Sequence, residues 1–134
     1  MTQARTVVVV ADEVGVYHCI SRCVRRAFLC GQDAYSGRNY EHRRAWVRER
    51  VQHLSALFGI EVFAYSVMSN HLHLVLRNRP DRVSQCGDRE VAERWCRLCP
   101  GKAARKNGEA YDAKKFKALL NDSVMLKVVR HRLQ

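Results

Sequence analysis

Two short stretches of alternating side chains, separated by only three residues, constrain the fold of this chain most. The first runs over 60–67 and the second over 71–77, with Met68-Ser69-Asn70 between them. Alternation in short runs rich in β-branched and aromatic residues is typical of half-buried strands. The sequence therefore predicts a β-hairpin here. Strict alternation puts Val62 and Ala64 on one face of its first strand, and Tyr65 and Val67 on the other.

Patterning also predicts the elements around the hairpin. They are a strand over 15–22, a loop over 31–40, a helix over 41–58 that Gly59 ends, a loop over 78–88, a polar stretch over 101–110, and helices over 89–98, 111–120 and 126–133. The helix over 41–58 has an apolar stripe and an outer surface rich in arginine, so we expect it to be amphipathic. Trp46 and Trp95 fall on predicted helices, where tryptophan is more often a core residue than a stacking surface.

The order β–α–β–β–α followed by helical residues defines an α+β protein. It supplies five of the six elements of a ferredoxin-like βαββαβ sandwich, with an antiparallel sheet, helices on one face and further C-terminal helices. Two sources of the sixth strand stay open. It lies beyond Gln134, or the segment Val7–Val10 serves as an edge strand instead.

The composition indicates a class of binding partner and a cellular compartment. The chain has 24 Lys and Arg against 13 Asp and Glu, a net charge of +11, which favours a polyanion such as nucleic acid as the partner. Its longest apolar N-terminal run is too short for a signal peptide or a membrane span. With no secretion signal, the six cysteines are expected to be reduced thiols of a cytoplasmic protein.

The most specific motif is His71-Leu72-His73 in the second strand of the hairpin. Because side chains of a strand alternate, both histidines point one way, while Leu72, Leu74 and Leu76 point to the core. Two imidazoles at this spacing can bind one divalent cation, provided that another element supplies a third ligand. The alternative is a strand whose exposed positions happen to be histidine.

This motif, in the context AYSVMSNHLHLVLR, resembles the histidine–hydrophobic–histidine (HUH) signature of single-tyrosine transposases. Together with the opening YHCISRCVRRAFLCG, it is similar to the smallest insertion-sequence transposases and their REP-associated relatives over about residues 14–98. The resemblance implies that His71 and His73 bind Mg²⁺ or Mn²⁺. It also implies that the protein recognises hairpin-bearing single-stranded DNA, which a tyrosine hydroxyl cleaves and rejoins in DNA transposition.

The same resemblance implies an organisation and a location. Residues 1–100 would form the transposase-like domain, and 101–134 a basic helical segment that continues beyond the chain end in longer relatives. The protein would be cytoplasmic, associated with the nucleoid when bound to DNA, and without a membrane partner. A homodimer is compatible with this organisation.

The nucleophile is where the chain departs from the family. There, the tyrosine lies on a helix after the hairpin, with Asn or Gln one helical turn later. The only tyrosine after His73 is Tyr111, and one turn later stands Lys115, which repels a cation. Tyr111 is thus a weak candidate, and the catalytic helix is expected beyond Gln134 or lost. A non-catalytic binder of structured DNA or RNA is the alternative to an enzyme.

Other residues complete the predicted site. In a ferredoxin-like sheet the first strand lies next to the third, so His18 is a candidate third ligand or phosphate contact, although a histidine bonded to the backbone is an equal alternative. Five arginines are expected to contact the DNA backbone: Arg22, Arg25, Arg26, Arg43 and Arg44.

The cysteines offer a competing hypothesis. Cys96 and Cys99 have the spacing of a zinc pair, with Cys86 nearby, and a zinc-stabilised interaction domain would use them. A structural zinc site needs four ligands, and no second close pair stands nearby. The thiols are therefore expected to be buried small apolar groups or free surface groups.

Overall fold

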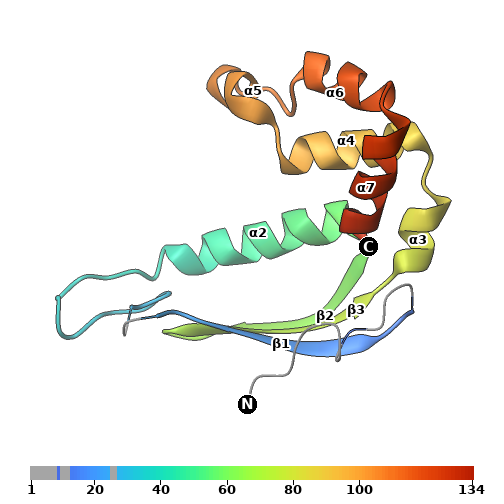
Figure 1. The fold of residues 1–134 in the computed structure, drawn as a ribbon. Helices are drawn as coiled ribbons and strands as arrows, with labels where there is room; N and C mark the ends of the chain where they lie inside the picture. The colour runs from blue at the N-terminus through green and yellow to red at the C-terminus, as the bar shows by residue number, and fades with distance from the viewer. Residues whose placement is uncertain (1–8, 10–12, 25–26) are drawn as a thin grey trace.

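The computed structural model describes residues 9, 13–24 and 27–134. An antiparallel sheet carries one long helix on one face, and shorter helices form a further layer beyond that helix (Figure 1). The elements are β1 (Val16–Arg22), α2 (Arg43–Leu57), β2 (Ile60–Val67), β3 (His71–Asn78), α3 (Pro80–Gln85), α4 (Asp88–Leu98), α5 (Gly101–Asn107), α6 (Ala113–Leu120) and α7 (Ser123–Leu133). The predicted α+β class is confirmed.

The sheet has the strand order β1-β3-β2, so the first strand lies beside the third. The hairpin of β2 and β3 is confirmed, and both ladders are antiparallel. The register is irregular between Val62 and Ala64, a β-bulge. Strict alternation is therefore wrong for Val62, which shares a face with Tyr65 and Val67 while Ala64 lies on the other face.

Helix α2 covers the inner face of the sheet. Leu72 and Leu74 of β3 line a cavity together with Val47, Val51 and Leu54 of α2, which confirms that these two leucines face inward. The side chains of β3 that alternate with these leucines, among them those of His71 and His73, point to the outer face. None of the described helices lies on that outer face (Figure 1).

The main core lies among the C-terminal helices and not under the sheet. Val91 and Cys96 of α4 are fully buried with Val129 and Leu133 of α7, and Phe116 of α6 joins the same cluster. Helix α4 thus belongs to this helical layer and reaches the rest of the fold through α2. In Figure 1, α4 lies on the far side of α2 from the sheet.

Two short helices occupy stretches without a predicted helix. The loop expected over 78–88 contains α3, in which Pro80 stands in the first turn and Asp81 follows it. Proline with its fixed φ is well suited to the first helical turn, and an acidic residue there favours the helix dipole. The polar stretch after Pro100 forms α5, which ends at a left-handed Gly108.

Gly59 connects the two layers. The sequence predicts that it ends α2, but the capping residue is the extended Phe58, and Gly59 is not among the positive-φ glycines. A side chain at Gly59 would meet Val83 Cγ2 at 2.5 Å and the Arg79 carbonyl oxygen at 2.7 Å. Its amide also donates to the Leu133 carbonyl oxygen at 2.8 Å. Close packing is therefore what requires glycine here.

Candidate metal and nucleic-acid site

Three imidazoles gather on the outer face of the sheet. His71 and His73 come from β3, and His18 comes from β1, which pairs with β3 directly. His18 Nε2 lies 2.9 Å from His73 Nδ1, with the two rings stacked 5.1 Å apart. The rings of His71 and His73 meet edge to face at 4.8 Å. The structure thus brings together all three predicted histidines, which we call the imidazole cluster.

The surroundings of His73 favour its neutral form. Partial desolvation, and then the charges that His71 and His18 can carry, hold the pKa of His73 below its ordinary value of 6.5. His73 is therefore mainly neutral at pH 7. A neutral imidazole has one nitrogen with a free lone pair, and this is the form that accepts a hydrogen bond or binds a metal.

Asn70 holds the ring of His71. The Asn70 side-chain oxygen lies 2.6 Å from His71 Nδ1. Because a carboxamide oxygen only accepts, this contact places a proton on Nδ1 and leaves the lone pair of the neutral ring at Nε2. Sequence reasoning treated Asn70 as part of a short connection. Its position next to the first histidine is the signal that points to this positioning contact.

The cluster fits part of a metal site. His18 Nε2 and His73 Nδ1, 2.9 Å apart, form a hydrogen bond in which one ring donates and the other accepts, so an ion bound by both nitrogens would have to replace the shared proton. In the described part of the chain, however, no group of three or more His, Cys, Asp or Glu side chains is arranged to hold an ion. Mg²⁺ and Mn²⁺ prefer oxygen ligands, so phosphate oxygens or water would have to complete the shell.

Among the predicted arginines, only Arg22 lies near the cluster in the described part of the chain. It stands opposite His71 in the β1–β3 register, at the exposed end of β1. Arg25 and Arg26 lie outside the described residues, as does most of the segment Val7–Val10. The phosphate contact assigned to Arg22 stays a prediction.

Arg43 and Arg44 lie on α2, across the sheet from the cluster. The Arg43 guanidinium covers the ring of Tyr40, 4.2 Å from its centroid, and donates to the Phe28 carbonyl oxygen. Arg44 pairs with Glu41 at 2.5 Å and donates to the Val67 carbonyl oxygen at 2.6 Å. Both arginines thus fasten α2 to neighbouring segments and do not join the imidazole cluster.

Tyr111 is also remote from the imidazoles. It precedes α6, and its half-buried ring lies 5.3 Å from that of Phe116 in the C-terminal core. Figure 1 shows α6 at the opposite end of the molecule from the outer face of the sheet. Lys115 donates to the Cys99 carbonyl oxygen at 2.7 Å. The arrangement gives Tyr111 a packing role and no route to a phosphate at the cluster.

The cysteines have the environment of buried or isolated thiols. Cys96 is fully buried, and burial raises the pKa of its thiol, as it does for Cys86. A raised pKa favours the protonated thiol, which binds zinc less readily than a thiolate. All six thiols are free.

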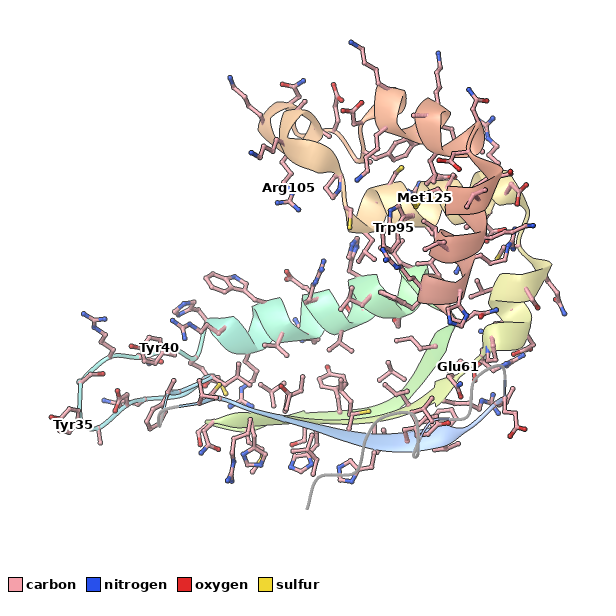
Figure 2. All side chains as sticks on the ribbon, in the orientation of Figure 1. Tyr35, Tyr40, Glu61, Trp95, Arg105 and Met125 are labelled. Carbon is pink, nitrogen blue, oxygen red and sulfur yellow. The ribbon has the colours of Figure 1, made fainter. Side chains whose placement is uncertain are left out.

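Trp46 differs from its sequence-based interpretation. Its side chain is 61% exposed on α2, so the prediction of a core residue is wrong there. It stands one position before Val47 of the apolar stripe, which turns it out of the core. Trp95 is partly buried against the C-terminal core, as predicted, and lies in the helical layer (Figure 2).

Comparison of this chain with protein-family models, with curated proteins and with solved structures gives no match. None of the described helices combines the length and apolar character that a membrane crossing needs.

Proposed function

We propose that this protein binds hairpin-bearing single-stranded DNA through the outer face of its sheet, in the manner of single-tyrosine HUH transposases. The observation that carries the proposal is the imidazole cluster, which lies on a sheet face that no described helix covers. The net charge of +11 supports a polyanionic partner. The protein would act in the cytoplasm, on the nucleoid.

The proposed fold is a ferredoxin-like sandwich that lacks a fourth strand among the described residues. The strand order β1-β3-β2, with α2 between the first two strands in sequence, supports this interpretation. The position of α4, on the far side of α2 from the sheet, is the feature that departs from it.

We propose His71 and His73 as ligands of Mg²⁺ or Mn²⁺, with His18 beside them. A bound divalent ion would withdraw charge from the oxygens of a nearby phosphate. The chain itself supplies a mainly neutral His73, a ring of His71 oriented by Asn70, and the Arg22 guanidinium at the end of β1. A guanidinium there can bind phosphate oxygens through two parallel hydrogen bonds.

A second candidate function is non-catalytic binding of structured DNA or RNA. The remote position of Tyr111 favours it for the chain as it stands. Cleavage in transposition needs a tyrosine oxygen in line with the phosphate. Tyr111, packed against Phe116 in the C-terminal core, does not meet this requirement.

The binding proposal is tested by fluorescence anisotropy with a labelled DNA hairpin that carries a single-stranded arm. Affinity should fall as salt rises, because each neutralised phosphate releases counterions. Arg22→Ala should weaken binding and reduce the salt slope by about one. Arg97→Ala is the matched control, because Arg97 pairs with Glu93 on α4. Absent or salt-insensitive binding would exclude DNA as the partner.

A further inference from the structure

A cavity of about 600 Å³ opens between α2 and the inner face of β3. Most of its wall is apolar. The apolar lining includes Leu29, Trp46, Val47, Leu54, Leu72 and Leu74. This volume is within the range of small-ligand sites, which are mostly apolar with a few polar groups at defined positions. It is separate from the outer face that carries the imidazole cluster.

Trp46 is an exposed aromatic residue at the edge of this cavity. Its side chain is 61% exposed, and the ring of His42 meets it edge to face at 4.8 Å. This contact supports the indole from one side. An exposed tryptophan beside an open apolar cavity is a large, flat surface on which another planar ring can stack.

Both of the charged residues that line the cavity with Trp46 are arginines. Arg43 and Arg50 stand three residues before and four after Trp46, so the three side chains share one face of α2. Tyr40 and the Phe28 carbonyl oxygen fix the Arg43 guanidinium. None of the carboxylates in the described ranges forms an ion pair with Arg50. An aromatic ring between two guanidinium groups suits a nucleotide, whose base stacks and whose phosphate binds.

We infer that an unpaired nucleobase of bound DNA stacks on Trp46 and enters this cavity, with Arg43 and Arg50 beside its phosphates. This inference rests on the proposed function, because it names a second contact for the same DNA. Leu72 in the cavity wall lies between His71 and His73 in the strand, yet points to the opposite face. The stacked base therefore belongs to a different nucleotide from the one at the imidazole cluster.

The test compares two short anionic strands of equal length, oligothymidylate and its abasic deoxyribose-phosphate counterpart. Base–aromatic stacking predicts that Trp46→Ala weakens oligothymidylate binding about 5- to 150-fold and leaves abasic binding unchanged. Trp46→Phe should retain most of the affinity, because a smaller ring still stacks. Arg50→Ala should weaken binding of both strands. Arg48→Ala should do less, because Arg48 lines a different cavity.

Fluorescence gives a second readout of the contact. Trp95→Phe leaves Trp46 as the only tryptophan, and oligothymidylate should quench it while the abasic strand should not. If Trp95→Phe fails to fold, anisotropy with Trp46→Ala in the otherwise unchanged chain still decides the question. Trp46 is exposed, so its replacement should leave the fold intact.

Three results would overturn the inference. Equal oligothymidylate affinity for wild type and Trp46→Ala removes the stacking contact but leaves the proposed function in place. A protein that binds neither strand nor a DNA hairpin removes both. A blue shift of Trp46 fluorescence on phosphatidylserine vesicles, without a response to oligothymidylate, would make the cavity a lipid contact.

Discussion

Glu61 binds three arginines at the start of β2, where its side chain is only 20% exposed (Figure 2). Arg77 pairs with it across the β2–β3 ladder, Arg79 approaches to 2.9 Å and Arg82 to 2.6 Å. The hydrogen bond from Arg77, followed by the charges of the arginines, holds the pKa of the Glu61 carboxyl below its ordinary value of 4.5. The charged form of Glu61 is thus favoured by folding.

We expect Glu61→Gln to lower the free energy of unfolding at pH 7. A depressed native pKa stabilises the fold above the unfolded pKa, and that stabilisation is lost as pH falls through the native pKa. The difference between wild type and variant should therefore be full above about pH 4.5 and shrink in more acidic solution. Urea unfolding at pH 7 and pH 3 measures it. Glu93→Gln, on an exposed helix pair, should show a smaller loss, and a pH-independent difference for Glu61→Gln would contradict the argument.

The imidazole cluster predicts weak binding of Mn²⁺. Replacing both His71 and His73 by alanine should abolish the heat signal in a calorimetric titration, because it removes both proposed strand ligands. His53→Ala and His131→Ala are the controls, since both residues are exposed on helices away from the outer face. Equal binding by the double variant and wild type would discard the site.

The residues of this cluster were predictable from sequence because strand alternation fixes which way His71 and His73 point. His18 depended on the strand order, which the element order suggested. The contact of Asn70 was not predictable in this way, because it depends on a side-chain rotation. The exposure of Trp46 follows from its place one position before Val47 of the apolar stripe, a spacing that a prediction from residue type alone did not use.

At the scale of elements, the connection between α2 and β2 is closely packed. Gly59 leaves no room for a side chain between Val83 and the Arg79 carbonyl oxygen. Sequence patterning found α2 and both strands of the hairpin within two residues of their ends, because their apolar periods are long enough to recognise. It missed α3 and α5, whose six and seven residues begin at or just after a proline or glycine.

Gly59→Ala is expected to destabilise the protein by about 1–3 kcal/mol, the usual cost of forcing extra atoms into a packed site. The added methyl group would push against backbone, which cannot rotate away as a side chain can. Thermal and urea unfolding measure the loss. Gly87→Ala is the matched control, because nothing lies within 4 Å of a Cβ built there. Equal stability of the two variants would refute the packing argument.

At the scale of the whole molecule, the helices after the hairpin bury their apolar surfaces against one another. The sequence predicted the α+β class and the adjacency of β1 and β3. It did not predict that α4 would join α6 and α7 in a separate core. The spacing of apolar residues shows that a helix has an apolar face, but it does not show which element packs against that face. That packing also carries Tyr111 away from the sheet.

We therefore expect no covalent protein–DNA adduct from this chain. A nucleophile that is not positioned loses an advantage of roughly 7–11 kcal/mol. Labelled single-stranded DNA bearing a hairpin, mixed with the protein and Mg²⁺ or Mn²⁺, should run unshifted on a denaturing gel. A shifted band that disappears in Tyr111→Phe would make Tyr111 the nucleophile.

The three histidines of the imidazole cluster lie on strands that are held in the sheet to different degrees. His71 and His73 lie on a strand paired on both sides, whereas His18 lies on β1, which pairs with β3 alone among the described strands. Edge strands fray at a lower free energy than central ones. Fraying of β1 would withdraw His18 from His73 and leave the other two rings in place. His71 and His73 are thus held by the central strand, whereas local opening of β1 would be enough to separate His18 from them.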